Sequence, residues 1–207
     1  MTSDRPLLIR LIRHGESAAN AGQPSSDPAT IPLTGRGRQQ AQAIADALTS
    51  PPAAIVCSPF LRARQTAMPS AARFGLEPEI WPIQEFTYLS PASCIGTTAA
   101  QRRARVEAYW HDADPDAIDG PGAESFAQFF SRIRTALEKL RTFEAQGEVL
   151  VFGHGQFMQA MRWLIEHGRQ SSWEAAMAAF RNRGQLLPIG NCDGFILARS
   201  GGALQLD

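Results

Sequence analysis

The sequence has 207 residues, 44% of them hydrophobic and 19% charged, and twenty basic residues cancel twenty acidic ones to a formal net charge of zero. This length and composition favour one globular domain with a full hydrophobic core. Zero net charge excludes a nucleic-acid-binding or membrane-surface protein that relies on bulk charge, so a local cluster of residues must bind any anion.

Cysteine use and the start of the chain give an expectation about compartment. Cys57, Cys94 and Cys192 lie far apart and form no C-x-x-C pair, which disfavours a disulfide framework, a zinc site or a redox motif. Residues 1–6 lack the apolar core of a signal peptide, and no stretch approaches the roughly 20 apolar residues of a membrane span. We therefore expect a cytoplasmic protein with no membrane partner.

The first third of the chain alternates apolar runs with helix-forming stretches. Leu7–Arg13 is predicted to be a strand buried on both faces, and Thr34 to be the N-cap of a helix over Gly35–Leu48. After a pair of prolines, Ala53–Cys57 is a second short strand. The next pair, Ser58-Pro59, predicts a helix with serine as its cap and proline at its first position.

Later segments continue this alternation. Pro69 is expected to end or kink the helix that follows Pro59. Further along, the sequence predicts helices over Ala99–Trp110, Ser125–Phe143 and Gln156–His167. It also predicts a third buried strand over Glu148–Phe152 and a terminal strand pair, Leu186–Ile189 with Phe195–Arg199, with N-C-D-G near its turn. Strands alternating with helices indicate an α/β fold with helices on both faces of the sheet.

Three of the predicted strands end in residues that suit an anion. The first runs into Arg13-His14-Gly15, the second into a segment containing Arg62, and the third into Gly153-His154-Gly155. Ligands of open α/β sheets bind beyond the carboxyl ends of the strands, so these side chains should converge on one crevice. Glycines would let backbone amides approach the ligand, and helix N-termini would add positive dipole ends. We expect this crevice to hold a phosphoryl group.

In their order along the chain, these residues resemble a known family. R-H-G-E-S (13–17), S-P-F-L-R-A-R-Q-T-A (58–67), Glu85, G-A-E-S (122–125) and G-H-G (153–155) resemble the histidine phosphatase superfamily, also called phosphoglycerate mutase-like. The resemblance implies a three-layer αβα sandwich with a mostly parallel central sheet. It also implies a single domain over residues 1–207, with a helical cap-like segment around 86–121, and no cofactor or metal.

The resemblance assigns a role to each matching residue. His14 would attack phosphorus and become a phosphohistidine, while Arg13, Arg62 and His154 would bind the phosphoryl oxygens. Glu85 would act as general acid on the leaving oxygen and then as base toward water. Further substrate contacts are expected at Ser17, Asn20 and Gly155. Gly153 departs from the family pattern, in which many members carry Ser or Thr before the second histidine.

Phosphoryl-transfer chemistry supports these roles independently of the resemblance. A histidine nucleophile must be neutral, and free imidazole has a pKa of about 6.5. An arginine about 6 Å away, at an effective dielectric of about 20, disfavours protonation by roughly 3 kcal/mol, or about 2 pKa units. We therefore expect Arg13 and Arg62 to bind the anion and also to keep His14 neutral.

Three functions remain open at this stage. The favoured one is a metal-independent phosphomonoesterase acting on a small phosphorylated metabolite. The second is a phosphoglycerate mutase, whose E-R-H-Y-G-like stretch is replaced here by E-F-T-Y-L (85–89). Phe86 and Leu89 are expected to form an apolar rim of the pocket, and Arg102, Arg103 or Arg105 remains a possible carboxylate anchor. The third is a non-catalytic binding module, which is disfavoured because His14, Arg62 and His154 are all present. Oligomeric state is left open.

Overall fold

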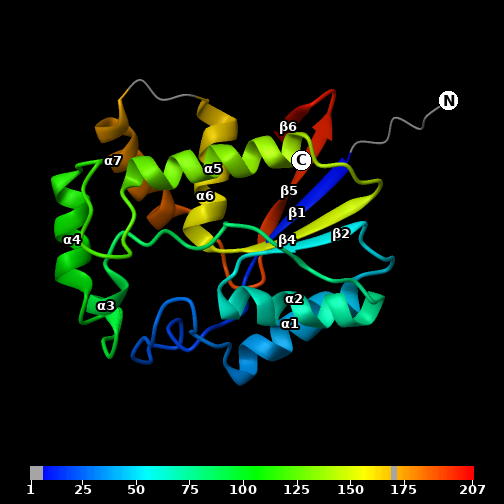
Figure 1. Cartoon of the computed structure of the whole chain (residues 1–207), viewed down its shortest axis with the longest axis horizontal. Coiled ribbons are helices and arrows are strands. Elements are labelled where there is room, and N and C mark those ends of the chain that lie inside the picture. Colours follow the sequence, from blue (N-terminus) through cyan, green and yellow to red (C-terminus); the bar gives the residue numbers. More distant parts are fainter. Residues whose placement is uncertain (1–6, 169–171) are drawn as a thin grey trace.

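A central sheet organises the computed structural model, which describes residues 7–168 and 172–207 (Figure 1). Its order over the described residues is β3-β2-β4-β1-β5-β6. The strands are β1 (Leu7–Arg13), β2 (Ala54–Cys57), β3 (Glu79–Ile80), β4 (Glu148–Gly153), β5 (Gly194–Ser200) and β6 (Ala203–Leu206). The pairs β1·β4, β2·β4 and β2·β3 are parallel, whereas β1·β5 and β5·β6 are antiparallel. The expected mostly parallel sheet is confirmed.

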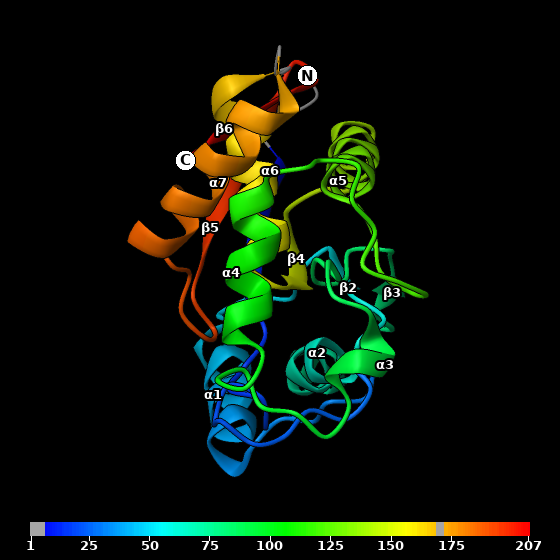
Figure 2. The same ribbon diagram turned by 90° about the vertical axis from the view of Figure 1, so that its left-hand side faces the viewer.

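Helices cover both faces of this sheet, as Figures 1 and 2 show. One face carries α1 (Gly35–Ala47) and α2 (Leu61–Phe74), where Ile12 and Phe152 pack with Ala67. On the other face, Leu11 packs with the aromatic residues of α5 (Phe126–Arg141) and α6 (Gly155–His167). Because Leu11 and Ile12 are adjacent and point to opposite faces, β1 must place apolar side chains on both faces of the sheet. The three-layer αβα architecture is therefore confirmed.

The described chain contains three further helices, at the end of the molecule where α3 and α4 are labelled in Figure 1. They are α3 (Pro91–Cys94), α4 (Arg103–Asp112) and α7 (Trp173–Leu186). The segment 86–121 includes α3 and α4, and Trp110 of α4 packs against Phe180 of α7 with ring centroids 6.3 Å apart. No helix among the described residues is long and apolar enough to span a membrane. Residues 1–6, where we expect no signal peptide, lie outside the described part.

Side-chain capping explains where several predicted helices begin. Thr34 caps α1 by accepting a hydrogen bond from Gly37 N at 3.0 Å, as expected. Ser125 and Gln128 form a reciprocal capping box at the start of α5. The prediction that Ser58 caps a helix beginning at Pro59 is wrong, because α2 begins at Leu61. Ser58 Oγ instead accepts from Phe60 N at 3.2 Å and contacts a histidine of the site described below.

Tertiary packing overrides local preference at two other places. Of the two effects expected at Pro69, an end of the helix is not found: α2 continues to Phe74 while Ala67 and Ala71 on its buried face pack against the sheet. Leu186 ends α7 and belongs to no strand, so the predicted pairing of Leu186–Ile189 with Phe195–Arg199 is wrong, and the terminal pair is β5 with β6. N-C-D-G does contain a turn, at Asn191 and Cys192, and its last residue, Gly194, begins β5. The sequence analysis did not identify α7, whose apolar residues are interrupted by polar ones at 181–185.

Candidate active site

The three polar strand ends meet at one edge of the sheet. Arg13 lies opposite Gly153 in the β1·β4 register, and Cys57 lies opposite Phe152 in the β2·β4 register. Directly beyond these pairs, His14 N donates to Gly153 O at 3.0 Å and Ser58 N donates to Phe152 O at 3.0 Å. The expected convergence of the first and third strand ends is confirmed, since the rings of His14 and His154 lie 5.1 Å apart, centroid to centroid.

The hydrogen bonds of His14 define which ring nitrogen is free to react. Nε2 lies 3.1 Å from Nε of Arg62, and a guanidinium N–H can only donate, so Nε2 must be the acceptor. The ring hydrogen is then on Nδ1, which donates to Gly15 O at 2.7 Å. The imidazole is therefore neutral, and its lone pair is on Nε2.

Burial and charge both favour this neutral form. His14 is only 3% exposed, and burial is the largest cause that lowers its pKa well below the usual 6.5. Arg62 and then Arg13 lower the pKa further by charge repulsion, while the hydrogen bond to Gly15 opposes them. The expectation that the arginines keep His14 neutral is confirmed in direction, although the sequence analysis did not include burial.

His154 is buried completely and its orientation is set by Ser58. Its Nε2 lies 2.8 Å from Ser58 Oγ, which already accepts from Phe60 N and can donate its own hydrogen to the ring. That arrangement leaves the ring hydrogen on Nδ1, a buried group with no acceptor among the described residues. Burial, followed by repulsion from Arg62, lowers the pKa of His154 well below its usual value. His154 can therefore offer a neutral N–H donor to an anion.

Two arginines add positive charge around the histidines. Arg62 is 7% exposed, and burial lowers its pKa to about 10, so its guanidinium stays charged at neutral pH. Besides His14, it donates through Nη1 to Pro28 O at 2.7 Å. Arg13 donates through Nη1 to Ile189 O at 2.5 Å, while its buried Nε has no acceptor among the described residues. Both guanidiniums therefore have donor groups available for phosphoryl oxygens.

The Glu85 carboxylate lies at the N-terminus of α6, which begins directly after His154. Its Oε1 accepts from the backbone N–H groups of Phe86, Gln156 and Phe157 at 3.1–3.2 Å. Oε2 has one longer contact, 3.4 Å from Gln156 N. Because Oε1 is occupied by three donors, Oε2 is the oxygen that can exchange a proton with a ligand.

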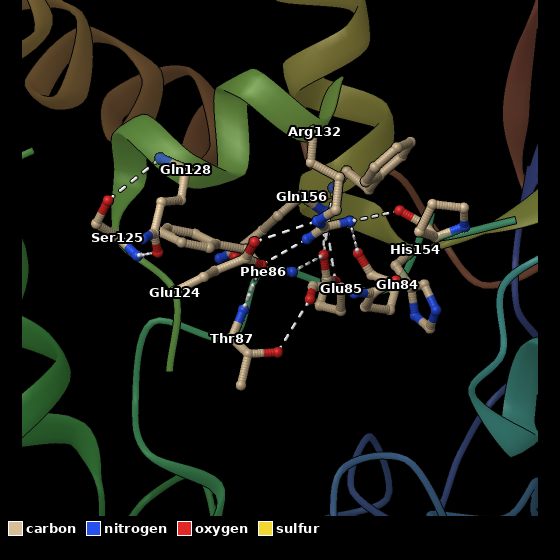
Figure 3. Close-up of polar contacts among 12 residues, drawn as sticks. Gln84, Glu85, Phe86, Thr87, Glu124, Ser125, Gln128, Arg132, His154 and Gln156 are labelled. Atoms are coloured by element: carbon tan, nitrogen blue, oxygen red, sulfur yellow. Dashed lines mark hydrogen bonds and ion pairs between the residues drawn. The ribbon is translucent and has the colours of Figure 1, made fainter. Parts of the chain in front are cut away.

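A clamp formed by Arg132 and Glu124 holds the chain on both sides of Glu85 (Figure 3). Arg132 Nη1 donates to Pro82 O and Gln84 O at 3.1 and 2.9 Å, and its Nε and Nη2 donate to the Glu124 carboxylate at 3.1 and 2.5 Å. Glu124 Oε1 in turn accepts from Thr87 N at 3.2 Å. The backbone immediately before and after Glu85 is thus tied to α5. The sequence analysis quoted G-A-E-S only as a family motif and missed Arg132.

Gly15 has a different role from the one expected. A Cβ on Gly15 would lie 2.6 Å from Gly37 O, and its amide donates to Thr66 Oγ1 at 3.0 Å rather than toward the crevice. The residue therefore allows the strand end to pack against α1 and does not bring an amide to a ligand. Gly155 begins α6, and a Cβ there would make ordinary contact with Arg13 Nε at 3.5 Å.

Ser17 and Asn20 contact each other beside the nucleophile loop. Ser17 Oγ and N both donate to Asn20 Oδ1, at 3.1 and 3.3 Å. The same oxygen accepts from Asn191 Nδ2 at 3.1 Å, and Asn191 also donates to His14 O at 2.9 Å. Asn20 Nδ2 is therefore the part of this group that is free to donate to a substrate. Sequence reasoning missed Asn191, whose only signal was its position in a turn-forming stretch.

The expected apolar rim at Phe86 and Leu89 is wrong. Phe86 is 4% exposed and stacks on Phe129 with ring centroids 4.3 Å apart, and Leu89 is also buried. Phe86 belongs to the hydrophobic core, whereas the carboxylate of the neighbouring Glu85 contacts the amides of α6. Two of the three arginines considered as carboxylate anchors are engaged elsewhere: Arg102 donates to Thr97 O, and Arg105 pairs with Asp119 at 2.6 Å.

Comparison with known proteins identifies the family behind this geometry. Residues 9–181 match the family model described as histidine phosphatase superfamily, branch 1. The chain belongs to this superfamily. His14 and His154 both fall within the matched region, and the predicted phosphoglycerate mutase-like α/β fold is that of the family. The protein is accordingly a histidine phosphatase-type enzyme.

Curated relatives carry both phosphatase and mutase names. A probable phosphoglycerate mutase GpmB of Yersinia enterocolitica is 28% identical over 72% of this chain and 70% of its own length. A metal-independent phosphoserine phosphatase of Arabidopsis thaliana is 29% identical over 74% of this chain and 66% of its own. A Mycobacterium tuberculosis relative is 40% identical over 101 residues, and the match spans 17% of that protein's length. These names leave the reaction of this histidine phosphatase to be argued from its site.

A solved structure supports the fold across most of the chain. A putative alpha-ribazole-5′-P phosphatase from Escherichia coli superposes with a TM-score of 0.74 at 24% identity. The alignment covers 97% of this chain and 94% of the other. At this identity the likeness shows the fold alone, which agrees with the three-layer sandwich described above.

Proposed function

We propose that this histidine phosphatase is a metal-independent phosphomonoesterase that hydrolyses a small phosphorylated metabolite through a phosphohistidine at His14. The observation that carries the proposal is the tautomer of His14, with Nδ1–H fixed on Gly15 O and the Nε2 lone pair next to Arg62. A neutral nucleophile beside a permanent positive charge is what attack on an anionic phosphoryl group requires.

In the first step, the Nε2 lone pair of His14 forms a bond to phosphorus while the bond from phosphorus to the ester oxygen breaks. Arg62 Nε–H shifts from Nε2 to a phosphoryl oxygen, and Arg13 and the Nδ1–H of His154 donate to the other oxygens. Glu85 gives a proton from Oε2 to the departing oxygen. The charge that spreads over the phosphoryl oxygens is thereby met by donors already held in place.

In the second step, a water oxygen attacks phosphorus and loses its proton to Glu85 Oε2. The bond between phosphorus and Nε2 breaks, its electron pair returns to His14, and inorganic phosphate leaves. Glu85 is reprotonated for the next cycle by this same transfer, so the two steps balance without an external acid or base.

Metal independence is supported by the donors of the site. Arg13, Arg62 and His154 can meet the phosphoryl charge together, and the described residues contain no group of three or more His, Cys, Asp or Glu side chains that could hold a metal ion. Ser17, Asn20 and Gly155 are proposed as additional substrate contacts, and the segment 86–121 as a cap, because its Trp110 lines a cleft shared with Arg13 and Glu85.

The experiment measures phosphate release from phosphomonoesters after exhaustive treatment with EDTA. The proposal expects activity to survive chelation. Loss of activity on chelation that Mg²⁺ or Zn²⁺ restores would contradict it.

A phosphoglycerate mutase is the second candidate function. It is favoured by a cation, Arg181, in the cleft that Arg13 and Glu85 also line. Assay of 2- and 3-phosphoglycerate interconversion with the bisphosphate primer separates the two reactions. A phosphatase releases inorganic phosphate faster than it interconverts the isomers, whereas the reverse ratio would identify a mutase.

A further inference from the structure

A cleft of about 300 Å³ adjoins the candidate active site and carries a residue to which the family resemblance assigns no role. Three of its lining residues belong to the site already described: Arg13, Glu85 and Gly155. The opposite wall comes from α4 and α7, through Trp110 and Arg181. The volume lies at the lower end of the roughly 300–1,000 Å³ range of small-molecule pockets. A leaving group attached to a phosphoryl group at His14 would extend into this space.

Two neighbours hold the Arg181 guanidinium in the wall of the cleft. Its Cζ lies 5.3 Å from the centroid of the Trp110 ring. Gln185, with its amide turned so that the oxygen faces Arg181, accepts from Nε and Nη2 at 3.3 Å. The side chain is half-buried. Stacking against an aromatic ring and an amide contact fix the plane of the guanidinium without neutralising its charge.

Arg181 differs from its neighbours in lacking an acidic partner. Arg183, two residues further along α7, pairs with Glu166 at 2.7 Å, and Arg162 of α6 pairs with the same carboxylate at 2.9 Å. Over residues 7–168 and 172–207, no carboxylate oxygen lies within 4.0 Å of Arg181. A half-buried, oriented guanidinium with unsatisfied charge in a ligand-sized cleft is a site for an anionic group.

We propose that Arg181 binds a carboxylate on the leaving group, so that the preferred substrates of this enzyme are phosphomonoesters of small organic acids. This proposal rests on the proposed phosphatase function and adds the substrate class. The carboxylate would contact the guanidinium edge that faces the cleft, while the phosphoryl group lies on Arg13, Arg62 and His154. The anchor is thus on α7 and not in the 93–105 segment, where the sequence analysis had looked for it.

The test compares two esters that differ at one carbon. In 3-phosphoglycerate this carbon is a carboxylate, and in glycerol 3-phosphate it is a hydroxymethyl group. The ratio of kcat/KM for the two is measured for the wild type, for Arg181→Gln, and for Arg183→Gln as a matched control from the same helix that does not line the cleft. p-Nitrophenyl phosphate, whose leaving group carries no carboxylate, is a third substrate that reports on phosphoryl transfer.

We expect the wild type to prefer the carboxylate ester, and Arg181→Gln to lower that preference roughly 10- to 100-fold, as expected for loss of a charge-assisted hydrogen bond. Arg183→Gln should leave both this preference and the activity on p-nitrophenyl phosphate unchanged. No preference in the wild type, or an equal loss on both esters in Arg181→Gln, would overturn the proposal. Absence of phosphate release from all three compounds would instead overturn the proposed function.

Discussion

Replacing Arg132 by glutamine removes the guanidinium that joins Glu124 to the backbone on either side of Glu85. Its four hydrogen bonds, at 2.5–3.1 Å, end on one carboxylate and on the carbonyl groups of Pro82 and Gln84. None of these contacts reaches the phosphoryl site, so Arg132 acts on the reaction through the position of Glu85. We predict that the variant loses proton donation while His14 remains reactive.

The magnitude follows from burial and from the worth of a positioned acid. Arg132 and Glu124 are 14% and 19% exposed, and removing one partner from a buried pair costs about 3–5 kcal/mol. Their partial exposure reduces the expected destabilisation to about 2–3 kcal/mol. General acid catalysis is worth roughly 10²–10⁴-fold, and a misplacement of about 1 Å can cost roughly 10²-fold. We therefore expect about a 100-fold lower kcat for esters with poor leaving groups.

The assay compares glycerol 3-phosphate with p-nitrophenyl phosphate, whose leaving oxygen needs little protonation. Arg132→Gln should lose about 100-fold on the first ester and only a few-fold on the second. Adding the substitution to Glu85→Gln should cause almost no further loss on glycerol 3-phosphate, since the acid is already absent. Arg134→Gln, an exposed arginine on the same helix, is the control. Equal losses on both esters, or additive losses in the double variant, would refute the positioning role.

Three further predictions concern pH, packing and the second histidine. The pKa values of His14 and His154 are lowered in the folded state, so their contribution to stability is present above pH 6.5 and is lost as pH falls below it. Urea unfolding should show that the free energy of unfolding falls by up to about 1.4 kcal/mol per histidine for each pH unit below 6.5. His14→Gln should remove the contribution of His14 to this pH dependence. An unchanged pH dependence in that variant would contradict the lowered pKa of His14. In the same measurement, Gly15→Ala should lower the free energy of unfolding by about 1–3 kcal/mol, because its Cβ would lie 2.6 Å from the carbonyl oxygen of Gly37. A variant as stable as the wild type would show that the loop adjusts freely. Ser58→Ala should lower kcat/KM roughly 10-fold by releasing the ring hydrogen of His154 from Nδ1, and undiminished activity would remove Ser58 from the account.

The strand ends could be predicted from sequence because the signal is local. Each strand is a short apolar run followed at once by its polar residues, so β1, β2 and β4 and the histidines after two of them follow from adjacent positions. The N-caps Thr34 and Ser125 are equally local, since the capping oxygen and the amide it binds are three residues apart.

What the sequence could not give depends on contacts between distant residues. Arg132 reaches the carbonyl of Gln84 across 48 positions, and Ser58 reaches His154 across 96. Phe86 looks like a rim residue beside a catalytic glutamate, yet it stacks on Phe129 of a helix that begins forty positions later. Arg181 lies on a helix that the apolar pattern did not reveal, and its position in the cleft follows only from the packing of α7 against α4.

The central claim is that His14 Nε2 carries the phosphoryl group during turnover. Enzyme mixed with a phosphomonoester and quenched rapidly should contain acid-labile phosphate on His14 by mass spectrometry, formed and lost at rates consistent with kcat. The variant His14→Ala should show neither the modification nor turnover. Full activity of that variant, or phosphate found only on another residue of a kinetically competent intermediate, would contradict the mechanism.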